Sequence, residues 1–197
     1  MKLKQLFETV KSFPTSKEEV EALLKKYNIT NYVINEDLSV DVNGNVRLSR
    51  KNLQAIPVKF GKVSGYFYCY NNQITSLQGA PREVSRSFVC YDNKLISLQG
   101  APREVGGNFW CSDNQLATLE GSPIVVHGDF ACTDNQLASL KGAPREVGGN
   151  FYCHDNQLAS LKGAPREVGG NFYCRANRLT SLDGIGNVGG EIISGLS

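Results

Sequence analysis

The chain has 197 residues, of which 41% are hydrophobic and 20% charged, a composition typical of one soluble domain that buries a continuous core. Its 21 basic and 19 acidic side chains leave a net charge of +2, which gives no bulk electrostatic reason to expect nucleic acid or an anionic membrane as partner. The sequence contains neither an apolar run of signal length nor one long enough for a membrane span, which predicts a cytoplasmic protein.

The first residues have the spacing of amphipathic helices. Apolar residues recur at helical intervals as far as Val10, and Pro14 then breaks the pattern, so a first helix is expected to end near residue 13. Ser16 followed by Glu19 is a capping box, and an apolar stripe continues from there to about Tyr27. This pattern predicts a second helix.

Strand-like alternation follows over residues 32–42, and the turn signal Asn43-Gly44 comes next. Together with the helices it predicts an N-terminal α/β cap over residues 1–41. A solenoid needs a cap, because its first coil would otherwise expose apolar side chains and an unpaired strand edge. A structural role explains this segment, and an added binding role for its many lysines is the alternative.

A repeat with a period of 21 residues fills the rest of the chain. The stretch GAPREVGGNFYCHDNQLASLK at 142–162 recurs almost unchanged at 163–183, and looser copies reach back to a degenerate one at Val42. A fixed period of about 20–50 residues is the signature of a solenoid. Residues 42–197 therefore predict about seven stacked coils, the last of them degenerate.

Equivalent positions of the repeat form columns of one residue type, and the apolar columns predict the core. One column holds Phe67, Phe88, Phe109, Phe130, Phe151 and Phe172. Another holds Cys69, Cys90, Cys111, Cys132, Cys153 and Cys174. Because neighbouring strands lie about 4.8 Å apart, these thiols are expected to pack as a buried internal ladder. Metal and disulfide roles are less favoured, since the paired ligands of a zinc site are absent and the spacing is that of one column.

Polar columns follow the strand and the return of each coil. The amides Asn72, Asn93, Asn114, Asn135, Asn156 and Asn177 are expected to satisfy backbone groups of the turn. The carboxylates Asp92, Asp113, Asp134 and Asp155 stand beside them and must draw on backbone donors or cations, with calcium as a minor alternative. The pairs Arg82-Glu83, Arg103-Glu104, Arg145-Glu146 and Arg166-Glu167 are expected to compensate each other on the return segment.

The pattern Phe-x-Cys-x-x-Asn-x-Leu-x-Ser-Leu resembles a leucine-rich repeat over about residues 42–194, with Phe and Cys in place of the first leucines. The repeat sequences GAPREVGGNFYC and DNQLASL are similar to those of short leucine-rich repeat proteins encoded by bacteriophages and some bacteria. The resemblance implies a parallel β solenoid, horseshoe-like or flatter, that binds partners. This chain departs from most members in being short and in carrying neither a catalytic domain nor a secretion signal, so an appended ligase activity is not expected.

Alternation along the strand sends the residues that flank Phe and Cys outward. Six of the eight tyrosines and the single tryptophan fall on such positions. The candidate binding residues are Tyr66, Tyr68, Tyr70, Tyr91, Trp110, Tyr152, His154, Tyr173 and Arg175. Aromatic residues favour strands for structural reasons as well, but these outward positions vary between repeats far more than their surroundings, as a binding face would.

These observations predict a non-enzymatic scaffold that binds a protein through its aromatic face, without cofactor or metal. His127 and His154 are the only histidines, and no nucleophile, phosphate loop or zinc spacing accompanies them. The resemblance implies a phage protein that acts in the host cytoplasm on a host protein, for instance by inhibiting a defence or regulatory factor. The alternatives are nucleic-acid binding through stacked aromatics with Arg175 and the N-terminal lysines, which the aspartate column opposes, and self-association through a solenoid end.

Overall fold

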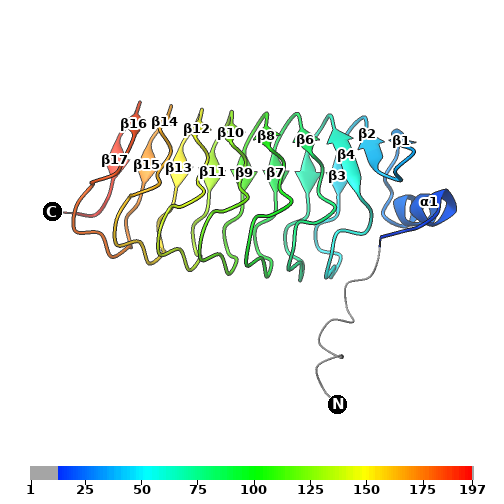
Figure 1. The fold of residues 1–197 in the computed structure, drawn as a ribbon, viewed down its shortest axis with the longest axis horizontal. Coiled ribbons are helices and arrows are strands. Elements are labelled where there is room, and N and C mark those ends of the chain that lie inside the picture. The colour runs from blue at the N-terminus through cyan, green and yellow to red at the C-terminus, as the bar shows by residue number, and fades with distance from the viewer. Residues whose placement is uncertain (1–12, 197) are drawn as a thin grey trace, which may run out of the picture.

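A computed structural model describes residues 13–196 of the chain as a parallel β solenoid with one helix at its N-terminal end (Figure 1). Each coil contributes one short strand to each of two sheets. In the first, the nine-stranded sheet, the strands are β1 (Tyr32–Ile34), β2 (Val40–Val42), β4 (Phe60–Val63), β6 (Glu83–Val84), β8 (Glu104–Val105), β10 (Val125–Val126), β12 (Glu146–Val147), β14 (Glu167–Val168) and β16 (Asn187–Val188).

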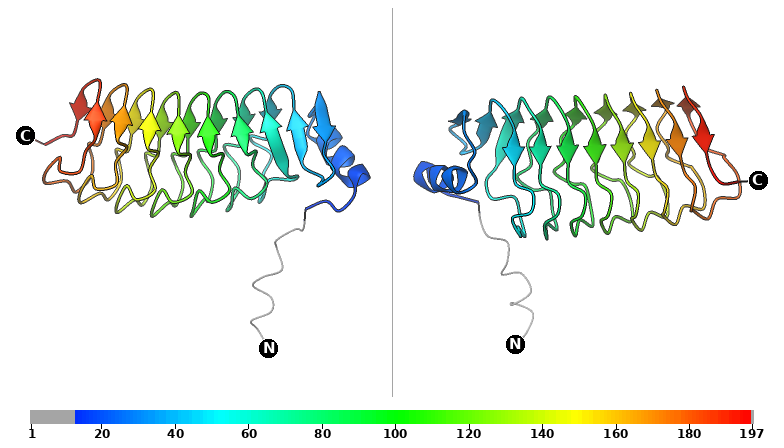
Figure 2. Two further views of the ribbon diagram at one scale, coloured as in Figure 1. Left: turned by 45° about the horizontal axis from the view of Figure 1, so that its top comes forward. Right: turned by 180° about the vertical axis from the view of Figure 1, so that it is seen from behind.

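The eight-stranded sheet carries the phenylalanine column. Its strands are β3 (Val46–Arg47), β5 (Phe67–Tyr68), β7 (Phe88–Val89), β9 (Phe109–Trp110), β11 (Phe130–Ala131), β13 (Phe151–Tyr152), β15 (Phe172–Tyr173) and β17 (Ile192–Ile193). Eight strands delimit seven complete turns, so the predicted repeat solenoid is confirmed. The coils stand in a nearly straight row in both views of Figure 2.

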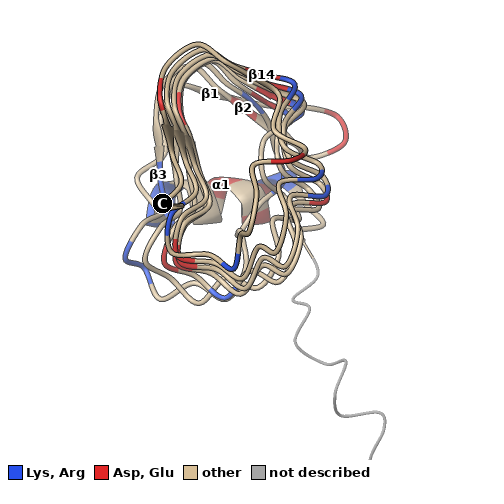
Figure 3. Cartoon of the chain, turned by 90° about the vertical axis from the view of Figure 1, so that its left-hand side faces the viewer, with Lys and Arg blue, Asp and Glu red and all other residues tan. Residues whose placement is uncertain are grey.

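The predicted return segment contains the strands of the nine-stranded sheet. Glu146 and Val147 pair in parallel with Glu167 and Val168, and the valines point into the core. Of the four Arg-Glu pairs, only Arg145–Glu146 forms an ion pair among residues 13–196, with Nε and Oε1 3.5 Å apart. Seen along the stack in Figure 3, the charged residues recur at the same corners of successive coils. Exposed pairs of this kind contribute little stability each.

The predicted helix after Ser16 in the N-terminal cap is confirmed. α1 (Lys17–Lys26) begins after Ser16, whose side-chain oxygen accepts a hydrogen bond from the Glu19 backbone N–H at 3.3 Å. The Glu19 carboxylate in turn accepts from the backbone N–H of Thr15, one residue earlier than a capping box requires. The first predicted helix lies outside the described residues. Among those that are described, no helix is long and apolar enough to cross a bilayer.

The strand-like alternation over residues 32–42 corresponds to two short strands. β1 and β2 are two antiparallel strands, because the chain reverses between them. In this turn the Asn35 N–H donates to the Ser39 carbonyl at 2.8 Å, and Leu38 has a φ of 60°. β2 also pairs in parallel with β4, so it is already the first strand of the solenoid.

The core is a set of vertical stacks. The phenylalanine rings of neighbouring coils lie parallel, with centroids 5.1 Å apart for Phe67 and Phe88 and 5.0 Å apart for Phe151 and Phe172. All six phenylalanines of this column have no exposed surface. The six cysteines are free and buried, which confirms the predicted internal thiol ladder.

Burial makes the thiols poor nucleophiles in the folded protein. It raises the pKa of Cys111 far above the ordinary range of a thiol, and it raises the pKa of Cys174, nearer the C-terminal end of the stack, to about 11. A raised pKa leaves less thiolate at a given pH, and the thiolate is the reactive form. At pH 8, iodoacetamide is expected to modify Cys174 first and Cys111 slowly, as read by peptide mass mapping. Prompt labelling of Cys111 in folded protein would contradict this, and guanidinium-unfolded protein is the positive control.

Candidate functional site

The outer face of the eight-stranded sheet carries all nine candidate binding residues. It consists of three columns of outward side chains. We name them the first, central and third columns, for the positions before Phe, after Phe and after Cys. From N- to C-terminal coils the central column reads Arg47, Tyr68, Val89, Trp110, Ala131, Tyr152, Tyr173 and Ile193.

The first column holds the coils together. Its side-chain oxygens accept hydrogen bonds from the backbone N–H of the same position in the next coil: Asn108 Oδ1 from Asp129 at 2.9 Å, and Asp129 Oδ1 from Asn150 at 2.7 Å. The Asn150 oxygen accepts from Asn171 in the same way at 2.7 Å. Alternation along the strand predicted that these residues lie on the outer face, but it did not predict this structural role. The available signal was the regular spacing of Ser, Asn or Asp directly before the phenylalanines from Phe88 to Phe172.

A tyrosine cluster covers the N-terminal part of the outer face. Tyr66 and Tyr68 stack within one coil with ring centroids 5.3 Å apart, and Tyr70 stacks on Tyr91 of the next coil at 4.7 Å with an interplanar angle of 8°. Two cations lie over these rings, since Arg86 is 5.5 Å from the centroid of Tyr66 and Arg50 is 5.8 Å from that of Tyr70. Cation–π contacts of this kind stabilise the tyrosine orientations.

A second aromatic cluster covers the C-terminal part. Tyr152 stacks on Tyr173 with centroids 4.7 Å apart and an angle of 13°, and His154 packs edge-on against Tyr152. The Asn150 side-chain N–H donates to the Tyr152 hydroxyl at 3.0 Å. Burial raises the pKa of Tyr152, and the charge of Asp129 raises it further. The rings are therefore held in fixed positions before any partner binds.

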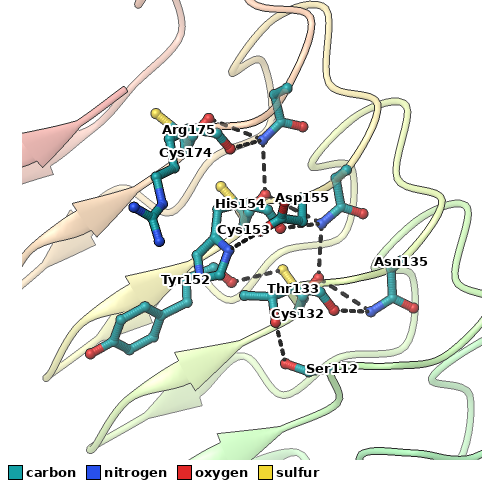
Figure 4. A network of polar contacts seen from close by, with 12 residues as sticks. Ser112, Cys132, Thr133, Asn135, Tyr152, Cys153, His154, Asp155, Cys174 and Arg175 are labelled. Atoms are coloured by element: carbon teal, nitrogen blue, oxygen red, sulfur yellow. Dashed lines mark hydrogen bonds and ion pairs between the residues drawn. The ribbon is translucent and has the colours of Figure 1, made fainter. Parts of the chain in front are cut away.

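Polar contacts order the third column beside this cluster (Figure 4). His154 Nδ1 lies 2.6 Å from Oδ2 of Asp155, and the Thr133 hydroxyl donates to that of Ser112 at 3.0 Å. Arg175 extends the column by one coil and is exposed. The face thus changes along the stack from tyrosine and arginine, through small polar residues, to a second aromatic cluster.

Trp110 stands alone between the two clusters. It is 38% exposed, and its neighbours in the central column are Val89 on one side and Ala131 on the other. An exposed tryptophan on an ordered strand is a common anchor in protein interfaces. The predicted residues consequently form two clusters and one isolated aromatic.

The aspartate column occupies a left-handed backbone position. Asp92, Asp113, Asp134 and Asp155 have φ between 53° and 56°, a conformation that short polar side chains tolerate better than most. Burial raises the pKa of Asp113, and the charges of Asp134 and Asp92 add to the effect. Within residues 13–196, no group of three side chains is arranged to hold a metal ion. The column turns the chain and gives one border of the face a negative potential.

A surface hollow of about 430 Å³ lies on the nine-stranded sheet, where Glu146 and Glu167 line it with His127. His127 Nε2 is 2.7 Å from Oε1 of Glu104, so both histidines have a carboxylate neighbour. None of the candidate binding residues lines this hollow. Comparison with protein-family models, with curated proteins and with solved structures finds no match to this chain.

Proposed function

We propose that this protein is a non-enzymatic binding scaffold whose outer face on the eight-stranded sheet receives a protein partner. The observation that carries the proposal is the separation of aromatic residues. Phenylalanines of the sheet have no exposed surface, whereas its tyrosines and Trp110 reach the opposite side. Core packing does not require aromatic residues outside, and Tyr and Trp are enriched where proteins bind each other.

The size and order of the face suit a protein partner. Six coils present about 18 outward residues, close to the roughly 20–30 per side of a standard interface. The pairs Tyr70–Tyr91 and Tyr152–Tyr173 are each ordered by mutual stacking. The hydroxyls of Tyr152 and Tyr173 also accept hydrogen bonds from the Asn150 and Asn171 side chains. A rigid aromatic surface loses little side-chain entropy on binding, which favours affinity.

The same stacking disfavours nucleic acid. In each tyrosine pair one ring face is covered by the other ring, which leaves fewer open faces for bases. The aspartate column along the border would repel phosphates over four successive coils. We therefore favour a protein partner over the nucleic-acid alternative.

The resemblance to short leucine-rich repeat proteins of bacteriophages extends the proposal. It suggests a phage-encoded protein that acts in the host cytoplasm by binding a host protein, with inhibition of a defence or regulatory factor as one consequence. The repeat sequences GAPREVGGNFYC and DNQLASL support this extension.

The face is tested by capturing partners from cells with the wild-type protein and with a Trp110→Ala, Tyr152→Ala double variant. The central column already contains Ala131 and Val89, so these changes are compatible with the coil. The double variant is expected to lose the partners that a Gln136→Ala, Gln157→Ala control retains, because both glutamines are exposed outside the three columns. Equal recovery by the two variants would reject the proposed face.

Self-association is the second candidate, and the C-terminal end of the stack favours it. β16 and β17 each pair with one strand only among the described residues, and Ile192 and Leu196 are both 40% exposed there. Unpaired strand edges with apolar side chains promote association. A sedimentation coefficient that rises with protein concentration would support this candidate, and a constant monomer value would exclude it.

A further inference from the structure

The central column of the outer face is interrupted at Ala131. Its register neighbours are Trp110 on β9 and Tyr152 on β13. Since parallel strands lie about 4.8 Å apart, the backbones that carry the two aromatic residues are separated by about 10 Å across a single methyl group. The gap therefore has the width of one missing ring in a stack.

Among residues 13–196, no aromatic ring of the preceding coil stacks on Tyr152. One face of its ring is covered by Tyr173 of the following coil at 4.7 Å, and its hydroxyl accepts a hydrogen bond from Asn150. The open face consequently looks toward the preceding coil, where the equivalent residue is Ala131. A planar group stacked on Tyr152 at the same distance would lie directly over the alanine methyl.

A carboxylate borders the gap. Asp129 belongs to the same coil as Ala131, and its charge acts on the Tyr152 hydroxyl. Its Oδ1 accepts the backbone N–H of Asn150, and it forms no ion pair among residues 13–196. Asp113 and Asp134 stand on the other border of the face. The potential inside the gap is negative, which favours a cationic guest.

The shape and the charge together select one type of side chain. A guanidinium is planar, stacks on aromatic rings and donates in a fork that matches a carboxylate, whereas an ammonium offers no flat surface. A tyrosine or phenylalanine guest would stack but would bury Asp129 without supplying a charged donor. A nucleobase would bring its phosphate near the aspartate column.

We propose that an arginine side chain of the protein partner enters the gap over Ala131, with its guanidinium parallel to the Tyr152 ring and paired with Asp129. This inference rests on the proposed function, because it identifies what the partner presents to the outer face. Trp110 is the register neighbour of Ala131 on the opposite side of the gap. The partner is then a protein that displays an exposed arginine on a surface facing the middle of the stack.

Trp110 provides the signal for the test, since it is the only tryptophan of the chain. Its indole N–H resonance is followed while an acetylated and amidated Gly-Arg-Gly tripeptide is added. The resonance is expected to shift and saturate. The same tripeptide with citrulline has nearly the shape of arginine but no charge. Its affinity is expected to be lower by a factor of about ten or more. Equal binding of the two peptides would overturn the proposal.

Two variants examine the walls of the gap. Asp129→Asn keeps the oxygen that accepts the Asn150 N–H, because Asn108 and Asn150 fill the same role in the same column. It should weaken arginine binding about tenfold or more. Ala131→Tyr should abolish binding by filling the gap, and Tyr152 and Tyr173 show that the column accepts tyrosine. Ala138→Tyr, an exposed site of the same coil outside the three columns, is the matched control and should bind normally.

Other outcomes separate this inference from the proposed function. A Gly-Phe-Gly peptide or a thymidine oligonucleotide that saturates the Trp110 signal at lower concentration than Gly-Arg-Gly would overturn arginine as the guest. No shift with any peptide, while the Trp110 and Tyr152 double variant still loses its partners, would reject the arginine guest and leave the face intact. Unchanged partner capture by the double variant would instead reject the proposed function.

Discussion

Replacing Asn135 with alanine is expected to lower the free energy of unfolding by about 3–5 kcal/mol, because several buried backbone groups lose their hydrogen bonds at once. The Asn135 side-chain N–H groups donate to the carbonyls of Cys111, Cys132 and Thr133 at 3.0–3.2 Å. Its oxygen accepts the Leu116 backbone N–H at 3.0 Å. Urea unfolding followed by circular dichroism measures the change.

The ladder supplies its own controls. Gln136→Ala removes an exposed amide from the adjacent position and should change stability by less than about 0.5 kcal/mol. Asn177→Ala removes the same set of hydrogen bonds from a partly exposed coil, where water can replace some of them, so a smaller loss is expected. If Asn135→Ala were no more destabilising than Gln136→Ala, the ladder would not be a source of stability.

Phe130→Ala is expected to have a comparable effect, about 3–5 kcal/mol, because it empties the middle of the phenylalanine stack. The Phe130 ring lies 5.5 Å from Phe109 and 5.3 Å from Phe151, centroid to centroid, and it is fully buried. The loss combines the transfer free energy of the ring with the cost of the cavity left between two rigid coils.

Phe130→Leu is the graded comparison, since leucine retains most of the apolar volume and should be less destabilising than alanine. Both variants are measured by the same urea unfolding. A Phe130→Ala protein that unfolds at the wild-type urea concentration would contradict the importance of the stack. A change in the denaturant slope would indicate that the coils on either side of residue 130 unfold separately, as the nearest-neighbour energetics of a solenoid allow.

The core and the asparagine ladder could be predicted from the sequence because each coil repeats the same contacts. When Phe or Asn recurs at a constant spacing of one coil, each residue lies next to its equivalent in the neighbouring coil. The spacing alone therefore predicts the contact between these residues. The second sheet could not be predicted in this way. From β6 onward its strands are two residues long, such as Glu146–Val147, and no apolar column marks them except the single valine of each coil.

Alternation along the strand predicted that the candidate residues point outward, but it did not predict which of their side chains stack on each other. Whether Tyr152 stacks on Tyr173 depends on the amides of Asn150 and Asn171, which hold the two hydroxyls. The left-handed conformation of the aspartate column was also missed, because Asp after a strand is equally consistent with a turn, a cap or a ligand. Such local choices arise from contacts between coils.

The coils at 142–162 and 163–183 are nearly identical in sequence, and each contacts only its neighbours. A copy of such a coil, inserted or removed as a unit, would create junctions that the stack already contains. Recombination between repeats can therefore change the number of coils without requiring a new kind of contact between neighbouring coils. Lengthening or shortening would move the two aromatic clusters apart or together in steps of one strand spacing, about 4.8 Å. The distance between the two aromatic clusters can thus change independently of the residues within each cluster.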